Sequence, residues 1–171
     1  MKALTSKQIS NLLREMGQIE DPHCAEDVPA YIQHIQFYVP QNYGRVESFI
    51  SRYIAEVIIK GDLVFQLDDW SPWDEARVYV IKSLWPEFDE TKNQGFGGGL
   101  LFSQTESSKA LALFSLVTVF GWKCYLYSDD LCLYNWEGEI FDAWTSSGEK
   151  MDSIKQLINQ YKFEFVPYGD D

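Results

Sequence analysis

The sequence predicts an α+β domain, with a helix-rich N-terminal half and an antiparallel β-meander in the C-terminal half, packed on a buried apolar helix. Three strand-like segments at 123–128, 131–136 and 140–144 are separated by only two or three residues. Such short turns join antiparallel neighbours, because parallel strands need a long crossover. Helical apolar periodicity dominates the first half instead. No repeat or linker composition interrupts the chain, so we expect one domain over residues 1–171.

Three helices are predicted in the first half. Thr5 and Gln8 form a capping-box pattern ahead of an apolar stripe that Gly17 ends. Residues 42–61 follow the helical period and end at a glycine, and Ser71-Pro72 with Asp74 predicts a helix over 72–84. Residues 18–41 contain three prolines, and the spacing of Tyr31, Ile32, Ile35 and Tyr38 suggests at most a short helix.

The run Gly95-Phe96-Gly97-Gly98-Gly99 resembles part of a nucleotide-binding loop but lacks its context. A dinucleotide fingerprint needs a third glycine where Leu100 stands, and a P-loop needs a terminal Gly-Lys-Ser/Thr. The following residues, 100–102, are typical of a strand. We therefore expect an irregular entry into an inner strand, where a neighbouring group lies too close for a Cβ.

The second half contains two further helices, at 105–120 and 148–161. The first is apolar almost all round, which predicts burial at the centre of the domain. Besides the meander and 100–102, strands are predicted at 63–67 and 163–166.

The hairpin at 123–136 permits a prediction of register. If Asp129-Asp130 is a two-residue turn, Tyr125 pairs with Tyr134 and Tyr127 with Cys132. Cys124 and Cys132 then point to opposite faces and do not form a disulfide. The face with Cys124 is aliphatic and suits packing on the helix at 105–120. The other face is aromatic: it is either covered by a second layer or exposed for recognition.

The net charge of −12 is concentrated in one part of the chain. Residues 61–171 hold 8 Lys and Arg against 19 Asp and Glu, whereas residues 1–60 hold 6 against 7. Such a field repels nucleic acids and anionic membranes and attracts basic proteins, although it also serves solubility. No secretory h-region or membrane-length apolar run occurs, so we expect a cytoplasmic protein without a nucleic-acid or membrane partner.

Candidate catalytic groups are present but lack a recognisable motif. The only histidines are His23 and His34, and the three cysteines form no CxxC pair. Carboxylates are numerous but lack metal-loop spacing and stand mostly at turns or helix starts. We therefore predict no catalytic, metal or cofactor residues. A small hydrolase that uses surface carboxylates or a cysteine stays open as an alternative.

Two aromatic and acidic groups are candidate binding surfaces, because Tyr and Trp combine large contact area with a polar atom. They comprise Tyr125, Tyr127, Asp129, Asp130, Tyr134 and Trp136 in the hairpin, and Asp68, Asp69, Trp70 and Trp73 after the strand at 63–67.

The block GWKCYLYSDDLCLYNWEGEIFDAW at 121–144 resembles small acidic bacterial immunity-type proteins, which neutralise toxins. The resemblance is one of overall style over about the last 80 residues. It implies a non-enzymatic protein-binding module that blocks a basic toxin. A domain whose acidic surface provides solubility alone, with no basic partner, is the third hypothesis.

Overall fold

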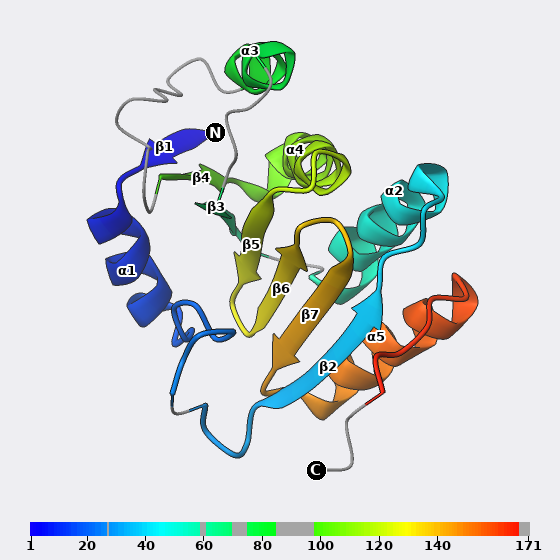
Figure 1. Ribbon diagram of the computed structural model, residues 1–171. Coiled ribbons are helices and arrows are strands. Elements are labelled where there is room, and N and C mark those ends of the chain that lie inside the picture. The colour runs from blue at the N-terminus through cyan, green and yellow to red at the C-terminus, as the bar shows by residue number, and fades with distance from the viewer. Residues whose placement is uncertain (27, 59–60, 70–74, 85–97, 168–171) are drawn as a thin grey trace.

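The computed structural model describes residues 1–26, 28–58, 61–69, 75–84 and 98–167. It contains a seven-stranded antiparallel sheet in the order β1-β4-β3-β5-β6-β7-β2 (Figure 1). The strands are β1 (Lys2–Leu4), β2 (Gln33–Tyr38), β3 (Leu63–Asp69), β4 (Gly99–Phe102), β5 (Lys123–Ser128), β6 (Leu131–Trp136) and β7 (Ile140–Thr145). The helices are α1 (Ser6–Glu15), α2 (Tyr43–Arg52), α3 (Glu75–Leu84), α4 (Ser107–Val119) and α5 (Gly148–Gln160). The fold is therefore α+β, as predicted.

The sheet separates two apolar clusters. On one side, α2, α4 and α5 pack on the sheet and enclose the larger core (Figure 1). On the other side, Ile9 and Leu13 of α1 pack with Val64, Tyr125 and Tyr127 of β3 and β5. No helix in the described part of the chain is long and apolar enough to cross a membrane.

The first two predicted helices begin with side-chain caps in the structure. Thr5 and Gln8 form the predicted capping box, and the Arg45 backbone N–H donates to Asn42 Oδ1 at 3.1 Å. The helix predicted over 42–61 consists of α2 followed by a π-helical turn at Tyr53–Val57. The start predicted at Ser71 lies outside the described residues.

The meander is confirmed, including its register. Tyr125 pairs with Tyr134 and Tyr127 with Cys132, and Cys124 and Cys132 belong to the two different cores. All three cysteines are free. The meander packs on α4, which buries Leu113, Phe114 and Val117 against it. Val119 is nonetheless 40% exposed, so α4 is an outer layer and is not at the centre of the domain.

The N-terminal half is helix-rich only in part, because it also supplies β1, β2 and β3. The suggestion of a short helix within 18–41 is wrong for residues 33–38. These residues form β2, with Ile35 and Phe37 buried on one face. The strand predicted at 163–166 is reduced to one bridge, between Phe37 and Phe165. The three-residue strand β1 was not predicted.

The glycine run leads into an inner strand, as expected, and Gly99 is the glycine that lies within it. Gly99 lies in β4 between β1 and β3. A Cβ built on it would lie 2.3 Å from the Phe65 carbonyl oxygen and 2.7 Å from Ile9 Cδ1. Residues 95–97 lie outside the described part of the chain.

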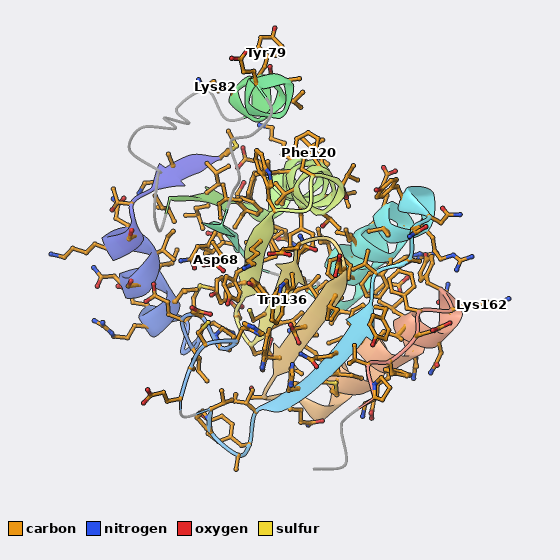
Figure 2. All side chains as sticks on the ribbon, viewed as in Figure 1. Asp68, Tyr79, Lys82, Phe120, Trp136 and Lys162 are labelled. Atoms are coloured by element: carbon orange, nitrogen blue, oxygen red, sulfur yellow. The ribbon has the colours of Figure 1, made fainter. Side chains whose placement is uncertain are left out.

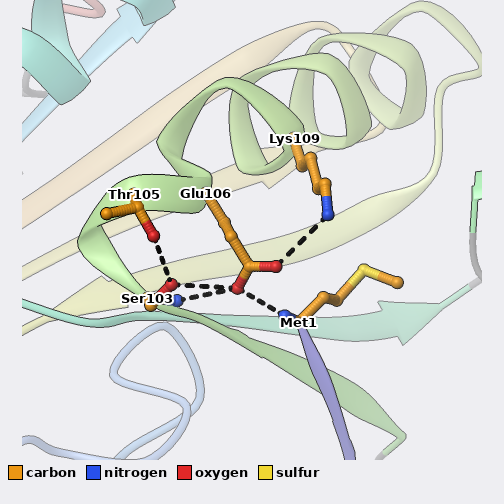
Figure 3. Close-up of polar contacts among 5 residues, drawn as sticks. All are labelled: Met1, Ser103, Thr105, Glu106 and Lys109. Carbon is orange, nitrogen blue, oxygen red and sulfur yellow. Dashed lines mark hydrogen bonds and ion pairs between the residues drawn. The ribbon is translucent and has the colours of Figure 1, made fainter.

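The N-terminal strand is fixed by a carboxylate at the start of α4 (Figure 3). Glu106 accepts from the Met1 ammonium, from Lys109 Nζ at 3.2 Å and from the Ser103 backbone N–H at 3.2 Å. These donors, the ammonium above all, lower the pKa of Glu106 to about 2. The contact holds β1 beside β4.

Candidate functional site

The aromatic face of the hairpin is covered, which decides between the two alternatives of the sequence analysis. Tyr125, Tyr127 and Tyr134 are 1%, 0% and 2% exposed. They lie beneath α1 and the segment of residues 18–26, which we call the strap. The prediction that these three tyrosines form a contact surface is therefore wrong, because a second layer removes them from solvent.

Asp21 fastens the strap to the tyrosines. Its backbone N–H donates to the Tyr127 hydroxyl at 3.1 Å, and the Tyr125 hydroxyl donates to its carboxylate. Asp21 adopts a left-handed φ of 50°, a conformation that Asp tolerates better than most residues. The Gln18 side chain also donates to the Ser128 carbonyl at 2.8 Å. The strap is thus held by polar contacts between residues more than 100 positions apart.

Burial raises the pKa of the hydroxyls of Tyr125, Tyr127 and Tyr134, and the carboxylates of Asp21 and Asp68 raise those of Tyr125 and Tyr134 further. The folded protein therefore keeps protons that the unfolded chain releases above pH 10. This contribution to stability is present below pH 10 and is lost as the pH rises beyond it.

We expect these tyrosines to ionise only as the protein unfolds. Tyrosinate absorbance followed together with circular dichroism should show a delayed step that coincides with loss of structure. Tyr125→Phe should remove one tyrosine from that step. Reversible ionisation of all ten tyrosines with unchanged circular dichroism would contradict the assignment.

The other predicted binding residues do not form one site. The turn before β6 consists of Asp129 and Asp130, whereas Trp136 ends that strand. Asp129 is exposed, and Asp130 pairs with Lys150. The two ends are about 17 Å apart at the usual rise per residue. Asp68 accepts a hydrogen bond from the Tyr134 hydroxyl at 3.1 Å. Trp70, Trp73 and the side chain of Asp69 lie outside the described residues.

One row of this face remains open. Trp136, Ile140 and Tyr38 pair across β6, β7 and β2, so their side chains share the face of the buried tyrosines. Trp136 is 38% and Tyr38 43% exposed, and we call the three residues the open strip. Figure 2 labels Trp136 and Asp68, both near the middle of the sheet in this view. Tyr38 and Ile140 were not among the predicted binding residues, and the register of β2 was needed to find them.

The backbones of two exposed glutamates are hydrogen-bonded to the end of β2, next to Tyr38 of the open strip. The Val39 N–H donates to the Glu139 carbonyl and the Tyr38 N–H to the Glu164 carbonyl, each at 2.8 Å. Both glutamates are exposed. On the other side, Glu137 pairs with Lys123, whose Nζ lies 5.9 Å from the centroid of the Trp136 ring.

Both histidines of the chain converge on one buried carboxylate. Asp142 in β7 has no exposed side-chain surface, and its Oδ1 lies 2.9 Å from His34 Nε2. His23 Nδ1 lies 3.7 Å from Oδ2, beyond hydrogen-bonding distance. His34 stacks on Trp144 with ring centroids 4.6 Å apart. The sequence signal for this cluster is a carboxylate, Asp142, at an inward position of an apolar strand.

The cysteines are poorly suited to nucleophilic catalysis. Burial raises the pKa of Cys124 and Cys132 well above the usual range, so little thiolate forms at neutral pH. Partial desolvation and the charge of Asp21 raise the pKa of the exposed Cys24. Within the described residues, no three His, Cys, Asp or Glu side chains are arranged to hold a metal ion.

Comparison with known proteins gives no relative: no family model, no curated protein and no solved structure matches this chain.

Proposed function

We propose that this protein is a non-enzymatic binding module for a basic protein, which it contacts through the open strip and the carboxylates beside it. The observation that carries the proposal is the exposure of Trp136 and Tyr38 in one row of the sheet face on which Tyr125, Tyr127 and Tyr134 are buried. Large aromatic side chains with a polar atom are the residues that most often dominate binding energy at interfaces.

The charge distribution supports a basic partner. Glu139 and Glu164 are exposed, their backbone carbonyls accept hydrogen bonds from Val39 and Tyr38, and the chain as a whole carries a charge of −12. Opposite charges accelerate association by steering, and salt weakens this effect. An immunity-type inhibitor of a basic bacterial toxin fits this description, and the style of residues 121–144 favours it.

The test begins with affinity capture from a lysate of the native host at low and high salt. We expect one stoichiometric basic protein that is lost as salt rises. Its affinity is then measured for Tyr38→Ser and for Tyr43→Ser, a matched change at a 57% exposed tyrosine in α2. Tyr38→Ser should weaken binding about tenfold, and Tyr43→Ser should leave it unchanged. Equal affinities for the two variants would contradict the proposed surface.

A second candidate function is acid–base hydrolysis, and the contact between His34 and Asp142 is the observation that favours it. A carboxylate can orient a histidine that then transfers protons. His34 is 30% exposed, so a small substrate could reach it. Hydrolysis of a model ester that disappears in His34→Gln would favour this candidate over the binding module.

A further inference from the structure

The side chain of His23 is enclosed by three aromatic rings. Its ring centroid lies 5.1 Å from that of Tyr134, 4.5 Å from that of Trp136 and 6.5 Å from that of Trp144. The Tyr134 ring is nearly parallel to the imidazole, at 28°, and the two tryptophans meet it at 79° and 71°. We call Tyr134, Trp136 and Trp144 the aromatic cage.

The base of the cage is the fully buried carboxylate of Asp142. Among the described residues, none donates a hydrogen bond to its Oδ2, and His23 Nδ1 stops 3.7 Å away. A buried carboxylate oxygen without a donor is costly, and buried charges are normally paired and hydrogen-bonded. Aromatic rings attract organic cations, and a carboxylate accepts strong hydrogen bonds from ammonium and guanidinium groups.

We propose that the aromatic cage binds the cationic side chain of a lysine or arginine, and that His23 occupies the cage when the protein is free. The ammonium or guanidinium would donate to Asp142 Oδ2 and lie against the cage rings. This inference rests on the proposed function, since the cation would belong to the basic partner. Trp136 is shared by the cage and the open strip, so a protein docked on the strip can reach the cage.

The strap can release His23 without detaching. Asp21, two residues earlier, is hydrogen-bonded to Tyr125 and Tyr127. The Cys24 backbone N–H also donates to the Asp21 carboxylate. His23 itself is held by ring contacts and the 3.7 Å approach to Asp142. Trp136 already accommodates one cation, since Lys123 Nζ lies 5.9 Å from its ring.

The test uses n-butylammonium as a probe for a lysine side chain and 1-butanol as its neutral counterpart. Each is titrated into the full chain while the indole N–H signals of Trp136 and Trp144 are followed by NMR. His23→Ala should bind n-butylammonium at least about tenfold more tightly than 1-butanol. The wild type and His23→Phe, which keeps a ring in the cage, should bind it about tenfold more weakly than His23→Ala.

A double variant identifies the carboxylate. Adding Asp142→Asn to His23→Ala should remove the preference for the cation while the chain keeps a cooperative thermal transition. Binding by His23→Ala that does not distinguish the two probes, or no binding at all, would overturn the cage. That result would not change the affinity that Tyr38→Ser has for the basic partner, so the two proposals can fail separately.

Discussion

Gly99→Ala is expected to lower the free energy of unfolding by about 1–3 kcal/mol or more, as overpacking does in a close-packed interior. The new methyl group would lie 2.3 Å from the Phe65 carbonyl oxygen, a backbone atom fixed by the pairing of β3 with β4. It would also lie 2.7 Å from Ile9 Cδ1, which belongs to α1. Relief therefore requires β4 or β3 to move, and both lie inside the sheet.

Gly44→Ala is the matched control. Gly44 lies in α2, and its nearest neighbour would be Asn42 Oδ1 at 3.6 Å, an ordinary contact. Alanine is favoured over glycine in a helix by about 0.5–1 kcal/mol, so this variant should be as stable as the wild type or more stable. Chemical denaturation measures both changes. A Gly99→Ala protein with wild-type stability would show that β4 does not approach β3 and α1 this closely.

The elements predicted well from sequence depend on local signals. A two-residue turn at Asp129-Asp130 determines which residues of β5 and β6 face each other, so the register and the separation of Cys124 from Cys132 followed from spacing alone. Thr5 and Asn42 cap their helices through neighbours within three residues. Such contacts can be recognised without knowing the rest of the fold.

The elements predicted poorly depend on distant partners. Strand β2 is an edge strand with only Ile35 and Phe37 buried, and it follows a segment interrupted by prolines, so its alternation was too short to outweigh the helical spacing. Its position is determined by β7, more than 100 residues later. Asp21 and Tyr125 are likewise more than 100 residues apart in the sequence, and so are both histidines and Asp142.

The candidate site was predicted only in outline. The sequence identified an aromatic hairpin face with acids near it, and Trp136 is the member of that set that belongs to the open strip. It could not reveal that the strap covers Tyr125, Tyr127 and Tyr134, because residues 18–26 have no periodicity and attach through polar contacts.

Reversing the two carboxylates beside Tyr38 is expected to have the largest effect on partner binding. Glu139→Lys and Glu164→Lys together place two positive charges against a basic surface, and like charges across an interface cost several kcal/mol. Both side chains are exposed, so the fold should persist. The expected loss of affinity is about a hundredfold, arising from slower association and faster dissociation.

The affinity of the captured basic partner for this double variant, compared with Glu47→Lys plus Asp152→Lys, tests the central claim most directly. Glu47 and Asp152 are exposed in α2 and α5, on the other side of the sheet, and the two double variants have the same net charge. We predict about a hundredfold weaker binding for the pair beside Tyr38 and no more than about a threefold change for the distant pair. Equal losses in both would mean that only the overall charge attracts the partner, and the open strip would then not be its binding site.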